Sequence, residues 1–193
     1  MSVLVPSNDY VSQAGRAAHE LGMAALLGGN LFGRLALHPS VDRISDPRER
    51  GEVVNAAWRR YGTINSIGLA AVTVGWLGTR AEEARGAAKL TGRERALARA
   101  KDGLVGAVFV TGVASALEGV RFARQAPDGA VPLVDGSTPA PNATPRAARM
   151  KRSLNVLGAA SLAAEAALVA VNAALAQENF RRAPLRRRVR RWG

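Results

Sequence analysis

Four apolar stretches, separated by polar and charged connections, dominate the pattern along the chain. They cover residues 17–37, 62–79, 103–120 and 154–176. Each is close to the roughly 20 residues that a helix needs to cross the hydrocarbon core of a bilayer. The second stretch contains no charged residue, and each of the others contains very few. The pattern therefore predicts an all-α protein, a four-helix transmembrane bundle.

The connections carry signals for helix ends and turns. Residues 46–49 (Asp-Pro-Arg-Glu) and 91–94 (Thr-Gly-Arg-Glu) have the spacing of N-terminal caps, so helices should start there and run into the second and third stretches. A short turn near 86–90 would join these two helices as an antiparallel hairpin. Residues 127–145 contain five prolines, which predict a flexible loop that is not packed.

The chain thus divides into a flank at 1–16, a membrane domain at 17–178 and a basic tail at 179–193. Basic residues in the connections set the orientation of a multi-pass protein. Fifteen lie on the side that holds both termini, against eleven on the other side. We therefore expect a cell-membrane location with both termini in the cytoplasm.

A water-soluble four-helix bundle is the alternative to a membrane fold. Charged residues within the first and fourth stretches fit that alternative. Residues 61–79, however, form an uncharged run whose large apolar side chains point in all directions around a helix. Such a helix requires burial on every side, which favours the membrane interpretation.

Polar residues inside the predicted spans are the main candidates for chemistry, because ionisable groups in hydrocarbon are costly and usually face the bundle interior. In the fourth span, Gly158, Ser161, Glu165 and Asn172 share one helical face. The candidate intramembrane polar site comprises Asn30, Arg34, Glu118, Ser161, Glu165 and Asn172.

One pairing can be predicted without knowing the orientation. The first and third spans must run in the same direction, and Arg34 and Glu118 lie near the carboxyl ends of these spans. They should lie at similar depth, where an ion pair would lower the cost of both charges. We expect Arg34 and Glu118 to be close.

The polar site allows two functional interpretations. Glu165 and Asn30 could form the centre of a proton, cation or small-solute pathway. Alternatively, the same groups could hold Ala- and Gly-rich helices together through hydrogen bonds between helices. The second interpretation is favoured, because each polar group is single and no binding motif accompanies it. Gly29 and Gly33 form a Gly-x-x-x-Gly pattern that permits close helix packing or dimerisation.

The composition excludes several kinds of site. The chain has no cysteine and only two histidines, so thiolate chemistry is excluded and neither a metal site nor another cofactor is expected. Motifs of phosphate-binding loops, dinucleotide-binding folds, serine hydrolases and zinc proteases are lacking. An enzyme is therefore not the expected class, although membrane enzymes can act with a few dispersed polar residues.

The net charge of +12 suggests an anionic partner, and much of the charge lies in the tail. Beside the last span, a basic segment is well placed to contact anionic lipid head groups, with Trp192 at their level. Nucleic acid is the less favoured partner, because few aromatic residues are interleaved. The arginines expected to contact lipid are Arg186, Arg187, Arg188, Arg190 and Arg191.

Residues 26–61 resemble the opening of the transmembrane-protein-205-like group of small four-helix membrane proteins. The similar features are Gly28-Gly29 followed by Phe32, an apolar run to Pro39, and Arg59-Arg60-Tyr61 before the second span. The resemblance implies four spans and no established activity, and Arg34 departs from the family pattern.

Three functions remain open at this stage. The first is a structural or accessory membrane protein that associates with itself or with a larger complex. The second is a transporter of a small solute, ion or proton that uses Glu165. The third is a soluble helical bundle that binds an anionic partner through its tail.

Overall fold

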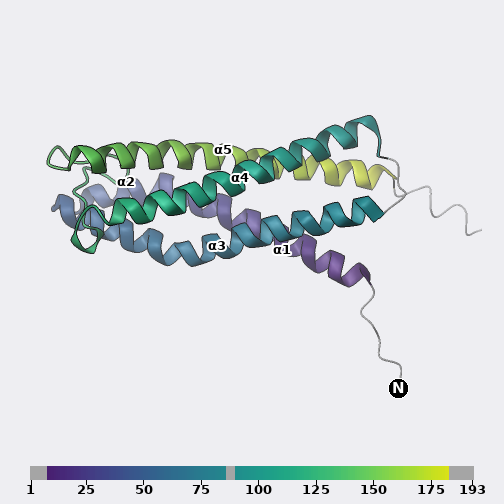
Figure 1. The fold of residues 1–193 in the computed structure, drawn as a ribbon, viewed down its shortest axis with the longest axis horizontal. Helices are drawn as coiled ribbons and strands as arrows, with labels where there is room; N and C mark the ends of the chain where they lie inside the picture. The colour runs from purple at the N-terminus through teal and green to yellow at the C-terminus, as the bar shows by residue number, and fades with distance from the viewer. Residues whose placement is uncertain (1–7, 86–89, 183–193) are drawn as a thin grey trace, which may run out of the picture.

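Four long helices make up most of the protein (Figure 1). The computed structural model describes residues 8–85 and 90–182. The long helices are α1 (Asn8–Phe32), α3 (Pro47–Arg85), α4 (Gly92–Ala123) and α5 (Pro145–Arg182). Together with the π-helical turn η1 (Gly33–Leu37) that continues α1, they contain the four predicted apolar stretches. The all-α, four-helix prediction is therefore confirmed.

The short elements lie at one end of the molecule, on the left in Figure 1. They are α2 (His38–Ser40), η2 (Val41–Arg43) and η3 (Pro127–Gly129). The start of α1 and the end of α5 lie at the opposite end (Figure 1). We call the first the loop end and the second the termini end.

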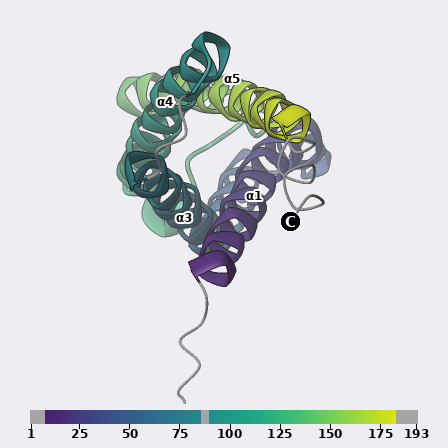
Figure 2. The ribbon, with the colours of Figure 1, turned by 90° about the vertical axis from the view of Figure 1, so that its right-hand side faces the viewer.

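The helices form a ring of four when the molecule is viewed along its length (Figure 2). Helix α1 packs most extensively on α3, and α4 packs most extensively on α5. The two pairs meet through smaller contacts of α1 with α5 and of α3 with α4. Helices α1 and α4 therefore lie diagonally across the ring.

Helices α3 and α4 begin at the caps that the sequence predicts. The Thr91 hydroxyl accepts from the backbone N–H of Glu94, and the Glu94 carboxylate accepts from the backbone N–H of Thr91, which completes a capping box. Asp46 precedes α3 and accepts from the backbone N–H of Arg48 at 2.9 Å. The turn that was predicted near 86–90 falls mostly outside the described residues.

Two apolar clusters fill the interior. The first takes side chains from all four long helices: Met23, Leu26, Val72, Val105, Val108, Ala164 and Leu168. The second lies at the loop end and is formed by Val41, Val54, Phe122, Val131, Leu133 and Ala147. Each helix therefore buries only a narrow stripe of its surface.

The proline-rich segment is packed, which corrects the prediction of a flexible, unpacked loop at 127–145. Leu133 is completely buried in the second cluster. The Arg50 guanidinium on α3 donates to the backbone oxygens of Ile44 and Val134, both at 2.6 Å. A Cβ on Gly51 would collide with the backbone oxygen of Val131. Prolines indicated that no long helix or strand would form, but they could not show that neighbouring residues enter the core.

Much of the outer surface of the helices is apolar. Helices α4 and α5 alone, among the described helices, are long and apolar enough to cross a membrane by length and composition. Only 11% and 22% of the residues in their apolar windows are buried. The core helix of a water-soluble protein would instead be mostly buried. These helices therefore turn apolar side chains outward.

Candidate functional site

A polar seam runs along the contact between α1 and α5, and Glu165 lies at its centre. The Asn30 side-chain amide donates to both Glu165 carboxylate oxygens, at 2.8 and 2.9 Å. The Ser161 hydroxyl, one turn away on α5, donates to Oε1 of Glu165 at 2.9 Å. Glu165 is 4% exposed. The structure thus brings Asn30, Ser161 and Glu165 together, and hydrogen bonds satisfy both carboxylate oxygens.

Two further contacts extend the seam along the bundle. Toward the loop end, the Arg34 guanidinium donates to the backbone oxygen of Asn155 at 2.6 Å. Toward the termini end, the Asn172 amide donates to the Glu20 carboxylate at 2.6 Å. The fourth-span face that sequence spacing indicated is therefore the face of α5 that meets α1.

The expected ion pair between Arg34 and Glu118 is not formed. Arg34 bonds to α5 and lies against Gly158, where a Cβ would come within 3.1 Å of its guanidinium. Glu118 instead pairs with Arg121 on its own helix, at 3.7 Å. Similar depth along the bundle does not bring the two side chains together, because α1 and α4 lie diagonally across the ring (Figure 2).

The Gly-x-x-x-Gly pattern of α1 is used for packing within the chain. A Cβ on Gly29 would overlap the Tyr61 ring, and a Cβ on Gly33 would overlap the Trp58 indole. The Tyr61 hydroxyl donates to the backbone oxygen of Ala25 at 2.5 Å. The two glycines therefore let aromatic rings of α3 lie directly on the α1 backbone.

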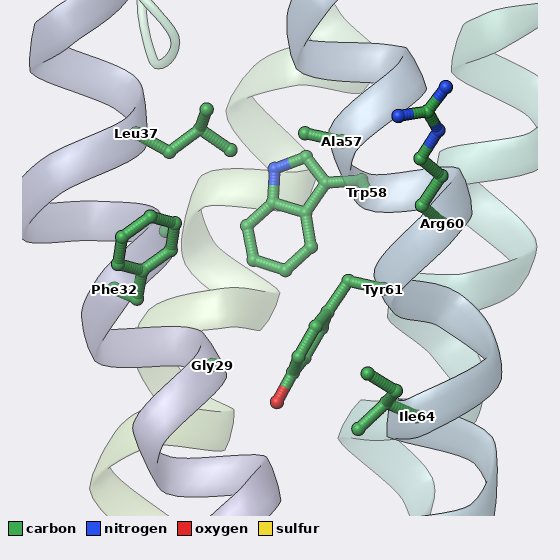
Figure 3. Close-up of a pocket in the computed structure, with 9 residues that line it drawn as sticks. Gly29, Phe32, Leu37, Ala57, Trp58, Arg60, Tyr61 and Ile64 are labelled. Atoms are coloured by element: carbon green, nitrogen blue, oxygen red, sulfur yellow. The ribbon is translucent and has the colours of Figure 1, made fainter.

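These rings form part of a shallow apolar groove of about 270 Å³ between α1 and α3 (Figure 3). Phe32 and Leu37 lie on the α1 side of the groove, and Trp58 and Tyr61 face them from α3 (Figure 3). Arg60 lies beside the groove near its Trp58 end. The groove is open on the outer surface of the molecule and presents almost only carbon.

A second polar group lies at the loop end, around His38. The Trp58 indole N–H donates to Nε2 of His38 at 3.0 Å, so Nδ1 carries the proton and donates to the Ser137 hydroxyl at 3.0 Å. Burial lowers the pKa of His38 to about 4, and the positive charges of Lys151 and Arg34 act in the same direction. His38 is therefore neutral at physiological pH.

Lys151, at the start of α5, is 4% exposed. Its ammonium lies 5.7 Å from the centre of the Phe122 ring. Burial lowers the pKa of Lys151 to about 8, and Asp135 opposes the shift. The ammonium is therefore costly to hold in the folded protein near neutral pH.

Sequence reasoning missed a third polar group, which joins α3 to α4. The Trp76 indole and the Arg80 guanidinium both donate to the Asp102 carboxylate, each at 2.7 Å to Oδ1. These bonds and the positive charges of Arg80 and Lys101 lower the pKa of Asp102, against the effect of its burial. All three residues lie near the ends of the predicted spans, where charge is common. Only their spacing across the hairpin could have suggested that they meet.

The predicted lipid contacts involve residues at the end of the chain. The tail arginines Arg186, Arg187, Arg188, Arg190 and Arg191 lie outside the described residues. Within residues 8–85 and 90–182, no group of three or more His, Asp or Glu side chains is placed to hold a metal ion.

Comparisons with known proteins give no functional assignment. No family model matches the chain, and neither a curated protein nor a solved structure matches it. The resemblance to the transmembrane-protein-205-like group therefore stays a prediction. What the fold and the polar seam define is an all-helical protein that exposes many large apolar side chains and whose apolar interior contains a hydrogen-bonded polar seam.

Proposed function

We propose that this is an integral membrane protein in which α1 and α3 cross the bilayer together with α4 and α5, the two helices that are long and apolar enough by composition. The observation that carries the proposal is the exposure of large apolar side chains around a bundle that also buries an acid. Glu165 is buried, whereas large apolar side chains are exposed on every long helix, among them Leu21 (72% exposed), Ile67 (65%), Val110 (64%) and Val156 (69%). Water-soluble monomers rarely expose apolar surface of this extent.

The role that the polar seam supports best is a structural or accessory one. Glu165 accepts hydrogen bonds from Asn30 and Ser161, and neither of the two cavities described for this protein is lined by Glu165. A carboxylate so fully engaged acts as a connection between helix pairs. We further propose that the protein associates with itself or with a larger membrane complex, with both termini cytoplasmic and the arginine tail against anionic lipid head groups.

A transporter that uses Glu165 is the second candidate. The observation that favours it is the location of a carboxylate at the centre of the α1–α5 seam. Helix α1 packs less extensively on α5 than on α3. Relative movement of the two helix pairs would expose Glu165. A Glu165→Gln protein that folds normally but loses uptake or proton flux in vesicles would support transport.

Membrane insertion is tested by fractionating cells that express the tagged full-length protein. We expect the protein to stay in the membrane pellet after an alkaline carbonate wash and to leave it only in detergent. A peripheral protein bound through its tail would be released by the same wash, and a soluble bundle would not pellet. Either of these outcomes would overturn the membrane proposal and make the basic tail the leading clue to a partner.

A further inference from the structure

The groove between α1 and α3 is lined by two aromatic rings whose polar atoms are already used inside the protein. The Trp58 indole N–H donates to His38 at 3.0 Å. The Tyr61 hydroxyl donates to the backbone oxygen of Ala25 at 2.5 Å. Both rings line the groove (Figure 3). The groove therefore offers a ligand carbon surface and few hydrogen bonds, which suits an apolar chain rather than a polar solute.

Arg60 also lines this groove, and its positive charge is not paired. Its side chain is exposed and forms no hydrogen bond or ion pair with any residue that the structure describes. The positions three and four residues from it along α3 are Ala56, Ala57, Thr63 and Ile64. None of these is an acid, so α3 supplies no neighbouring carboxylate to Arg60. In Figure 3 its guanidinium points toward the loop end, away from Ile64.

The order of these features matches the depth profile of a bilayer. Residues 61–79 contain no charge, and Arg59 and Arg60 directly precede them. In the proposed membrane arrangement, this pair therefore lies at the edge of the hydrocarbon core. Trp and Tyr side chains gather at the same level in membrane proteins, and Trp58 and Tyr61 lie there. From this level the groove extends toward Ile64 and the middle of the bundle (Figure 3).

We propose that the groove binds one anionic phospholipid of the surrounding bilayer. An acyl chain lies along Trp58 and Tyr61, and the lipid phosphate accepts from the Arg60 guanidinium, whose planar donors match phosphate oxygens. A lipid with net negative charge is preferred to a zwitterionic one, because Arg59 adds a second positive charge at the same level. The inference rests on the proposed membrane insertion.

This site is distinct from the expected lipid contact of the basic tail. The groove lies in the half of the bundle near the loop end, whereas α5 leads to the tail at the termini end. The two lipids would therefore belong to opposite leaflets. A groove of about 270 Å³ is slightly smaller than the roughly 300–1,000 Å³ of sites that enclose a drug-sized molecule. It can take part of one acyl chain, and the rest of the lipid stays in the bilayer.

A second copy of the chain fits the groove less well than a lipid. Two copies inserted with the same orientation are related by an axis along the bilayer normal, so equivalent residues lie at equal depth. An interface through the groove would bring Arg59 and Arg60 of both copies together at one level. Like charges that face each other across an interface oppose association. A lipid phosphate instead neutralises the charge of Arg60.

The test is photocrosslinking of the purified full-length protein in detergent, with phosphatidylglycerol that carries a diazirine in one acyl chain. Mass spectrometry identifies the labelled peptides, and competition with unlabelled phosphatidylglycerol or phosphatidylcholine of the same chains measures selectivity. Arg60→Gln removes the charge, and Ile64→Trp fills the groove. The matched controls are Arg59→Gln and Ile67→Trp, which change exposed side chains of α3 outside the groove. All four positions are exposed, so the variants should fold.

We expect saturable labelling of residues 29–37 and 57–64, with phosphatidylglycerol competing at least fivefold better than phosphatidylcholine. Arg60→Gln should lower the labelling at least fivefold and remove this selectivity. Ile64→Trp should lower the labelling by a similar factor, and both controls should stay within twofold of the wild type. The inference is overturned if the groove is not labelled, if the two lipids compete equally well, or if Arg60→Gln behaves like Arg59→Gln.

Two further measurements identify the reason for a failure. Light scattering gives the oligomeric state of the lipid-stripped protein, and a dimer that Ile64→Trp separates into monomers would assign the groove to a second copy and overturn the lipid site. The carbonate wash described above tests membrane insertion independently. A protein that resists the wash but shows no selective labelling refutes the lipid site alone. A protein that the wash releases refutes the lipid site and the membrane proposal together.

Discussion

Asn30 on α1 donates from one side-chain nitrogen to both carboxylate oxygens of Glu165 on α5. The two residues are 135 positions apart in the chain, and their contact joins the α1–α3 pair to the α4–α5 pair. Because the α1–α5 contact is smaller than the contact within either pair, we expect this bond to contribute to the register between the two pairs. It also provides the most direct test of the structural role proposed above.

The coupling between Asn30 and Glu165 should be measurable in a double-mutant cycle. Asn30→Ala and Glu165→Ala should each lower the free energy of unfolding, and the double variant should lose less than the sum of the two. Hydrogen bonds between membrane helices give coupling energies of roughly 0.6–2 kcal/mol, so a value near 1 kcal/mol is expected. Denaturant titration with sodium dodecyl sulfate, followed by circular dichroism, gives the four energies. Additive effects would contradict the direct contact.

Neighbouring glycines of α1 should respond in opposite ways to the same substitution. Gly29→Ala places a methyl group on the Tyr61 ring and should destabilise the protein by roughly 1–3 kcal/mol. A Cβ on Gly28 meets nothing within 4 Å, so Gly28→Ala should be neutral or should stabilise the helix by up to about 1 kcal/mol. Thermal unfolding of the two variants side by side checks this. Equal effects would show that Gly29 is not packed against Tyr61.

The lowered pKa of Lys151 predicts that the stability of the protein rises with pH in the alkaline range. Its pKa is about 8 in the folded protein against 10.5 ordinarily, so between these values the unfolded chain binds more protons. Stability therefore increases with pH across this window, by up to roughly 3 kcal/mol for a shift of that size. Lys151→Met should flatten the dependence, because the buried ammonium is removed. The test is to measure the free energy of unfolding of both proteins from pH 7 to pH 10.5. Parallel curves of this free energy against pH would contradict the prediction.

His38 should make the stability of the protein depend on pH in a separate, acid range. Its pKa is about 4 in the folded protein against 6.5 ordinarily, so its contribution to stability is present above pH 6.5 and is lost as the pH falls toward 4. His38→Gln should reduce this slope while leaving the alkaline window of Lys151 intact. Urea or dodecyl sulfate unfolding between pH 4 and pH 7 measures it. A slope that is unchanged in the variant would assign the acid sensitivity to other groups.

Arg50 should be the main attachment of the proline-rich segment to α3. Arg50→Ala removes donors to the backbone oxygens of Ile44 and Val134, and we expect a loss of roughly 1–3 kcal/mol. Limited proteolysis should then cut within 127–145 more readily in Arg50→Ala than in the wild type. Arg48→Ala is the matched control, because Arg48 is an exposed neighbour on the same helix turn. Equal proteolysis of both variants would show that Arg50 does not hold the segment.

Local features were well predicted from the sequence. The four helices follow from the length of the apolar stretches, and the starts of α3 and α4 follow from Asp46 and Thr91, because caps act within a few residues of themselves. The shared face of Ser161, Glu165 and Asn172 follows from helical spacing. Each of these predictions depends on backbone geometry that is the same in every helix.

Only the tertiary structure decided which helix packs against each helical face. Spacing placed Arg34 and Glu118 at similar depth, but the order of the helices around the ring put α5, rather than α4, beside Arg34. The burial of Leu133 and the contact of Trp76 and Arg80 with Asp102 likewise depend on contacts between separate segments. Periodicity fixes which residues share a face of a helix. It contains no information on which other helix meets that face, because that choice depends on packing across the whole bundle.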